Sequence, residues 1–94
     1  MPVTDLAERI RHDAGRFSVR VEGVEAELDY RRAGDRMTIL HTGVPAQVGG
    51  RGIAGALVKA ALDFARAEGL KVDPACAYAE GWMRKHPEYE DLRA

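Results

Sequence analysis

The feature that most constrains the fold of this chain is a glycine-rich stretch near its middle, between a strand-like pattern and a long helical pattern. The stretch reads Gln47-Val48-Gly49-Gly50-Arg51-Gly52, and it places glycines where a backbone can approach a ligand closely. A helix that starts directly after it points its first amides at the same spot, and these amides lack partners within the helix. Together with the positive end of the helix dipole, they favour an anion. The stretch therefore predicts a site for a phosphate-bearing cofactor.

Composition and charge narrow the class of protein. The chain has 94 residues, of which 46% are hydrophobic and 31% are charged, so we expect one small domain over residues 1–94. A net charge of −1 gives no electrostatic basis for nucleic-acid binding. The single cysteine, Cys76, excludes an internal disulfide and a cysteine-rich zinc site, and we expect no metal. With neither a signal-peptide pattern nor an apolar run of membrane-spanning length, the sequence predicts a cytoplasmic protein without a membrane partner.

Two alternating runs in the first third of the chain predict a β-hairpin. Residues 17–22 and 25–30 each alternate apolar and polar side chains, which is the pattern of half-buried strands. Gly23-Val24 between them fits a two-residue type II′ turn, which prefers glycine first. That turn would pair Val21 with Ala26, Val19 with Leu28, and Phe17 with Tyr30. Ahead of the hairpin, residues 4–12 fit either a short helix capped by Thr4 or an irregular strand, and both interpretations stay open.

A third strand is predicted over residues 37–44. Strict alternation places Met37, Ile39 and His41 on one face of this strand. Pro45 lacks a backbone donor and ends the ladder.

Helical and strand patterns then alternate to the end of the chain. Residues 51–68 predict a helix with Gly69 as its C-terminal cap, with the buried stripe Ala54, Leu57, Val58, Ala61, Leu62 and Ala65. Leu70 and Val72 predict a short strand, and Pro74 marks either a sheet edge or the end of that strand. Residues 77–85 predict a second helix that His86-Pro87 ends. The order predicts an α+β fold with three antiparallel strands, a strand–helix–strand crossover and a final helix, in which helices cover the sheet.

The glycine stretch allows several interpretations. Residues 50–55 spell the GxGxxG fingerprint of dinucleotide-binding folds, with Asp73 about twenty residues later, but an antiparallel hairpin precedes them instead of a strand–helix series. A nucleoside-triphosphatase loop needs Lys-Ser/Thr after its last glycine, where this chain has Ile53-Ala54. A plain glycine-rich turn is the structural alternative to any of these binding loops.

The wider pattern of Gln47-x-x-Gly50-x-Gly52, after a strand and opening a long helix, is similar to the Q/R-x-x-G-x-G/A acyl-CoA loop of the GNAT N-acetyltransferases. Further blocks extend the similarity: His41-Thr42-x-Val44-Pro45, Gly69-Leu70-Lys71-Val72-x-Pro74-x-Cys76 and Arg84-Lys85-His86-Pro87-x-Tyr89. In this order and spacing, the blocks resemble the small single-domain GNAT-like proteins from Phe17 to Leu92.

The resemblance implies a GNAT-like mixed sheet and a site for acetyl-CoA (coenzyme A). In the family, the pyrophosphate rests on backbone amides of the glycine loop. The pantetheine arm runs beside the preceding strand, which splays away from the following parallel strand. Carried over, the implied cofactor-binding residues are those of the strand and the loop: His41, Thr42, Gly43, Val44, Gln47, Val48, Gly49, Gly50, Arg51, Gly52, Ile53 and Ala54.

The residues for chemistry are harder to assign. Acetyl transfer to an amine needs a base, a donor for the oxyanion and an acid for the departing thiolate. Larger family members often use a glutamate on a central strand and a tyrosine on the last helix, whereas the third strand here has no glutamate and Trp82 stands near the tyrosine's place. The candidates are His41, a base or else a core histidine, and Cys76, a nucleophile or else a small buried residue. Tyr78 is either a proton donor or a packing partner of Trp82.

The sequence therefore predicts an acetyl-CoA-dependent N-acetyltransferase that transfers its acetyl group to an amine by direct attack. The alternative is a non-catalytic acyl-CoA- or CoA-binding module, or a protein-interaction module. The acceptor would be a small-molecule or protein amine, and the acidic face of the hairpin (Glu22, Glu25, Glu27 and Asp29) could attract it. Loops, the C-terminal segment or a second subunit would line the acceptor side, and the oligomeric state stays open.

Overall fold

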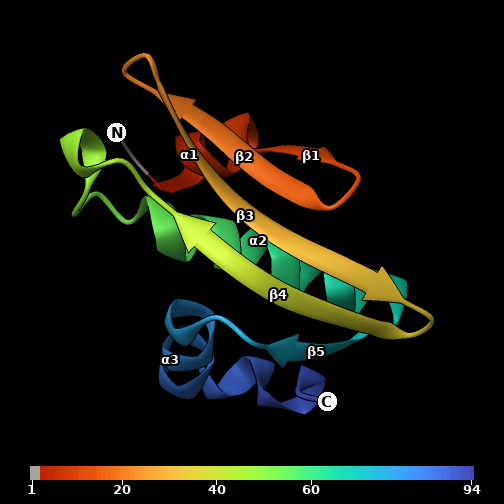
Figure 1. Ribbon diagram of the computed structural model, residues 1–94. Coiled ribbons are helices and arrows are strands. Elements are labelled where there is room, and N and C mark those ends of the chain that lie inside the picture. The colour runs from red at the N-terminus through yellow and green to blue at the C-terminus, as the bar shows by residue number, and fades with distance from the viewer. Residues whose placement is uncertain (1–2) are drawn as a thin grey trace.

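The computed structural model describes residues 3–94, with side chains from Leu6 onward, and confirms an α+β fold around one mixed sheet (Figure 1). The five strands stand in the order β1-β2-β3-β4-β5, and all neighbours are antiparallel except β4 and β5, which are parallel. The elements are α1 (Val3–Arg9), β1 (Arg11–Asp13), β2 (Arg16–Val21), β3 (Val24–Ala33), β4 (Arg36–Gly43), η1 (Ala46–Val48), α2 (Ile53–Glu68), β5 (Lys71–Pro74), α3 (Ala77–Lys85) and η2 (Pro87–Leu92).

Both interpretations of the N-terminal segment hold in part, because helix α1 is followed by the short strand β1. Helix α1 begins at Val3, so Thr4 lies inside it and the prediction that Thr4 caps it was wrong.

The hairpin forms, but its predicted turn and register were wrong. The turn is Glu22-Gly23, with φ of 51° and 81°, so both residues are left-handed as in a type I′ turn. Val21 therefore pairs with Val24, Val19 with Ala26 and Phe17 with Leu28. This register sets Arg20 opposite Glu25, whereas the predicted one would have set Arg20 opposite Glu27 and Glu22 opposite Glu25. The shift is two residues, so every predicted core side chain keeps its face.

Strand β4 contains a bulge that the sequence pattern did not predict. Tyr30 of β3 pairs with Ile39, but the preceding Asp29 pairs with His41, so Leu40 is an extra residue on β4. The bulge reverses the alternation beyond it. His41 therefore lies on the same face of the sheet as Asp29, and the buried Ile39 lies on the other face. The predicted placement of His41 beside Met37 and Ile39 was wrong.

Helix α2 covers one face of the sheet together with α1, while Figure 1 shows no described helix in front of the other face. Its ends are Gly52 and Gly69, both left-handed, so the cap predicted at Gly69 is confirmed and the helix begins two residues later than predicted. Ala54 is only half-buried, contrary to prediction. The buried side chains of α2 are Ile53, Ala56, Leu57, Val58, Ala61, Leu62 and Ala65, and they join a single hydrophobic core.

The C-terminal part closes the sheet at β5. Helix α3 packs beside β4 and β5, and η2 returns along the bottom of the view in Figure 1. Tyr89 and Leu92 are buried, as expected for an aromatic plug after the helix stop at His86-Pro87. The predicted edge strand is confirmed as β5. Among residues 3–94, no helix has both the length and the apolar character needed to cross a bilayer.

Candidate functional site

The glycine loop leads from η1 into α2 and leaves the first amides of the helix without helical partners. Gly50 and Gly52 have φ of 77° and 78°, a region that side chains other than glycine rarely adopt. The first hydrogen bond of the helix runs from the Ala56 amide to the Gly52 carbonyl at 3.0 Å. The amides of Ile53, Ala54 and Gly55 therefore lack an intrahelical acceptor, and no side chain of the described residues caps this end.

A hollow of about 250 Å³ lies directly at this helix end. A Cβ atom added at Gly50 or Gly52 would meet nothing within 4 Å, so the backbone of the loop faces open space. Its lining residues are Val44, Gly49, Gly50, Gly52, Ile53, Ala54 and Tyr78. Exposed amides, a helix dipole and absent side chains all favour a bound anion, so these residues fit a phosphate group.

The remaining predicted loop residues hold the loop in place or point away from it. Val48 is buried in the core and anchors the loop, so only its backbone is available to a ligand. Gln47 is exposed on η1. The guanidinium of Arg51 forms an ion pair with the carboxylate of Glu22 on the β2–β3 turn, and this partner lowers the pKa of Glu22. Arg51 thus ties the glycine loop to the hairpin.

A gap opens between β4 and β5 next to the hollow. The parallel pairing ends where Ile39 meets Pro74, while β4 continues through Gly43 and pairs there only with β3 among the described strands. Thr42 lies opposite the buried Leu28, so its side chain points to the helix-covered side. The Sγ atom of Cys76 donates to Thr42 Oγ1 at 3.6 Å across the gap. The β4–β5 ladder therefore ends at Ile39 and Pro74, and beyond it the side chains of Thr42 and Cys76 face each other.

Cys76 stands at the N-cap position of α3, half-buried at the mouth of the gap. Burial alone would raise the pKa of its thiol. Once the thiol ionises, its sulfur accepts hydrogen bonds from the backbone of Ala79, the hydroxyl of Thr42, and the backbones of Tyr78 and Thr42; these outweigh burial, so the pKa of Cys76 is lowered. A thiol in this position carries a larger thiolate fraction than a free cysteine.

His41 lies on the other side of β4, on the uncovered face of the sheet. Its side chain is 58% exposed, and its Nε2 atom is 3.2 Å from Oε2 of Glu27 on β3. Among the hydrogen bonds of the described residues, none joins His41 to Cys76. The structure therefore places the two predicted chemical residues on opposite sides of one strand. Glu27 is the contact that sequence reasoning missed, because β-sheet register, not proximity in the chain, brings it to His41.

The two aromatic residues on α3 have different neighbours. Tyr78 lines the hollow and is 44% exposed, and burial raises the pKa of its hydroxyl. Trp82 stacks instead on His86, with ring centroids 3.6 Å apart, and tilts against Tyr89. Gly55 permits this arrangement, because a Cβ atom there would lie 3.1 Å from Trp82 Nε1 and 3.4 Å from the Tyr78 hydroxyl. Tyr78 is thus the aromatic residue available to a bound ligand.

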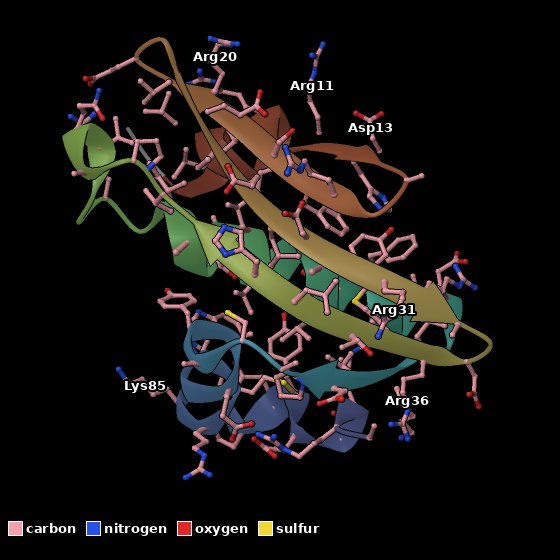
Figure 2. The ribbon with its side chains drawn as sticks, viewed as in Figure 1. Arg11, Asp13, Arg20, Arg31, Arg36 and Lys85 are labelled. Carbon is pink, nitrogen blue, oxygen red and sulfur yellow. The ribbon has the colours of Figure 1, made fainter. Side chains whose placement is uncertain are left out.

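A second hollow, of about 470 Å³, lies elsewhere and is a weaker candidate for a binding site. It is lined by Glu80, Arg84, Glu90 and Arg93, whose side chains form ion pairs of 2.6–2.8 Å with one another. Figure 2 also shows Arg11, Arg20 and Lys85 projecting outward from the periphery. The charges of the hollow neutralise each other, so the smaller hollow beside the gap is the better candidate site.

Comparison with known proteins agrees with this geometry. The model of the GCN5-related N-acetyl-transferase family matches residues 16–92. Protein NATD1 of Mus musculus is 44% identical over 84 residues, which cover 84% of this chain and 76% of that protein. Protein NATD1 of Danio rerio is 40% identical over 96 residues, which cover 93% and 87%. The solution structure of a GCN5-like protein from Staphylococcus aureus superimposes with a TM-score of 0.74 at 31% identity, covering 90% of this chain and 86% of that one.

Proposed function

The chain belongs to the GCN5-related N-acetyltransferase family, and from this premise we propose that it is an acetyl-CoA-dependent enzyme that acetylates an amine. The main support for the proposal is that the hollow at the start of α2 and the unpaired edge of β4 lie next to each other. The open backbone cradle at the start of α2 adjoins the unpaired edge of β4, and that edge borders Cys76 and His41 on its two sides. A phosphate site alone would not require the strands to part.

The glycine loop and the start of α2 would hold the phosphates through backbone amides. Gly50, Gly52, Ile53 and Ala54 line the hollow, and the dipole of a 16-residue helix favours negative charge there. The edge of β4 from Leu40 to Gly43 supplies backbone groups that a pantetheine arm would pair with in place of a strand. Bound acetyl-CoA would supply an activated thioester.

In direct transfer, the amine nitrogen forms a bond to the acetyl carbon while the carbon–sulfur bond breaks. The amine loses a proton, and the departing thiolate gains one. His41 is exposed on the uncovered face of β4 and is suited to accept the first proton, because a neutral imidazole keeps one nitrogen with a free lone pair. Tyr78, whose raised pKa keeps its hydroxyl protonated, is suited to supply the second.

Cys76 offers a second route through the same site. Its thiolate would accept the acetyl carbon and then pass it to the amine, with the proton transfers unchanged. Intact-mass measurement after mixing the protein with acetyl-CoA, without any amine, separates the routes. An acetyl group on Cys76 indicates a relay, whereas an unmodified protein that still turns over indicates direct attack. Cys76→Ala, assayed in parallel, should abolish only the relay.

Calorimetry with acetyl-CoA and with free coenzyme A, combined with thiol-release assays on a panel of amines, tests the proposal. We expect binding of both ligands and amine-dependent release of thiol. Binding without turnover of any amine would favour a non-catalytic acyl-CoA-binding module. One observation favours this second candidate: among the described residues, His41 and Cys76 contact different partners and do not contact each other. Absence of binding would refute both functions.

A further inference from the structure

We propose that Glu27 is a positioning residue that fixes the ring of His41 and selects the nitrogen that acts as base. This inference rests on the proposed function, because it assigns a residue to the acetyl-transfer site. The contact that carries it is the 3.2 Å hydrogen bond between His41 Nε2 and Glu27 Oε2. It exists because the bulge at Leu40 turns His41 onto the face of β3 that carries Glu27.

The ring nitrogen that serves as base follows from the chemistry of the pair. An ionised carboxylate only accepts hydrogen bonds, so the nitrogen that faces it carries the proton. In the neutral ring, Nε2 therefore donates to Glu27 and Nδ1 keeps the free lone pair. Nδ1 is then the atom that can take a proton from an amine. Without Glu27, both tautomers would be populated and the ring would rotate freely in solvent.

The surroundings support a dedicated contact between these two side chains. Glu27 is only 23% exposed, although it lies on the uncovered face. Asp29, the residue opposite His41, is held by Arg16 with contacts of 2.6 and 3.2 Å, so its carboxylate is already engaged. Arg16 also senses the charges of Glu27 and Glu25 at longer range. Glu27 is thus the carboxylate on β3 that is directed at His41.

Gly43 leaves the space in which the pair meets. It lies opposite Glu27 in the register of β3 and β4. A Cβ atom added there would stand 2.8 Å from His41 Nε2 and closer still to Glu27 Oε2. The absence of a side chain at Gly43 therefore lets the carboxylate reach the imidazole beside the gap. The bulge, the glutamate and the glycine together form one arrangement around His41.

Kinetics of Glu27→Ala test the inference, with Arg31→Ala as the control on the same strand and the same face. We expect Glu27→Ala to lower kcat about tenfold, the low end of the effect of groups that orient a histidine, with the KM for acetyl-CoA unchanged. Arg31→Ala should leave both values unchanged. In a His41→Ala background, adding Glu27→Ala should have no further effect, because Glu27 acts through the ring. Full kcat in Glu27→Ala, or an additive loss in the double variant, would overturn the proposal.

Nitrogen-15 NMR of the histidine side chains provides a test that does not depend on turnover. At a pH where the rings are neutral, His41 of the wild type should show the tautomer with the proton on Nε2, and Glu27→Ala should show a mixture. A wild-type ring with the proton on Nδ1 would overturn the assignment. If the wild type acetylates no amine, the proposed function fails, while the tautomer measurement still decides whether Glu27 fixes the ring.

Discussion

Replacing Gly50 with valine should remove affinity for acetyl-CoA while the protein stays folded. Gly50 has φ of 77°, and a Cβ atom there would meet nothing within 4 Å, so the substitution causes backbone strain and no steric clash. A β-branched residue at positive φ lowers the free energy of unfolding by about 1–3 kcal/mol. In a domain of this size, each kcal/mol lowers Tm by about 4–8 °C. A strain of about 2 kcal/mol therefore predicts that Tm falls by roughly 8–16 °C. The domain should stay folded, because domains are stable by about 5–15 kcal/mol.

Gly34→Val is the matched control for this substitution. Gly34 has φ of 60°, an added Cβ atom there also meets nothing within 4 Å, and it lies in the β3–β4 turn at the opposite end of the sheet from the glycine loop (Figure 1). Calorimetry on both variants separates strain from occlusion, with Tm measured in parallel. Both should lose similar stability, but only Gly50→Val should bind acetyl-CoA at least about tenfold more weakly, a loss of about 1.4 kcal/mol. Equal affinities in the two variants would refute the placement of the phosphates.

Three further substitutions probe the core, the thiol and the pair at β4. Leu57→Ala, at a fully buried position, should lower the free energy of unfolding by about 2–5 kcal/mol in urea, and a loss below about 1 kcal/mol would contradict its place in the core. Thr42→Val removes a hydroxyl that lowers the pKa of Cys76, so iodoacetamide should alkylate the thiol more slowly at pH 7; an unchanged rate would contradict the contact. Because the folded state lowers the pKa of Cys76, stability should rise with pH through the titration of the thiol, and Thr42→Val should reduce that rise. Gly43→Ala should displace Glu27 from His41 and lower kcat while acetyl-CoA affinity stays the same, because the added methyl group meets these two side chains; an unchanged kcat would contradict the role of the pair.

Local patterns predicted the elements and the loop well, for physical reasons. Alternation in residues 17–30 identified β2 and β3, because each strand buries one face and exposes the other. The helical period identified α2, and Gly69 marked its end, because a left-handed cap disfavours a side chain. The glycine loop was placed correctly at the start of the helix for the same reason, since Gly50 and Gly52 both need positive φ.

The errors arose where a single residue shifts a pattern. A turn moved by one residue shifted the pairing of β2 and β3 by two, and the alternation of side chains is compatible with both registers. At β4, the extra residue Leu40 placed His41 on the uncovered face, although strict alternation predicted the core. No local sequence pattern predicts such a bulge, because its position depends on how β3 and β4 pair.

By itself, the sequence determined an α+β chain with a bare backbone cradle opening a long helix, because glycine φ preferences and hydrophobic periodicity act within a few residues. Tertiary structure alone decided that β4 and β5 part after Ile39 and Pro74, and that Thr42 meets Cys76 across the opening. It also decided that His41 meets Glu27 and not the core. These contacts join residues 14 to 34 positions apart, and only the register of the paired strands and the packing of α3 bring them within hydrogen-bonding distance.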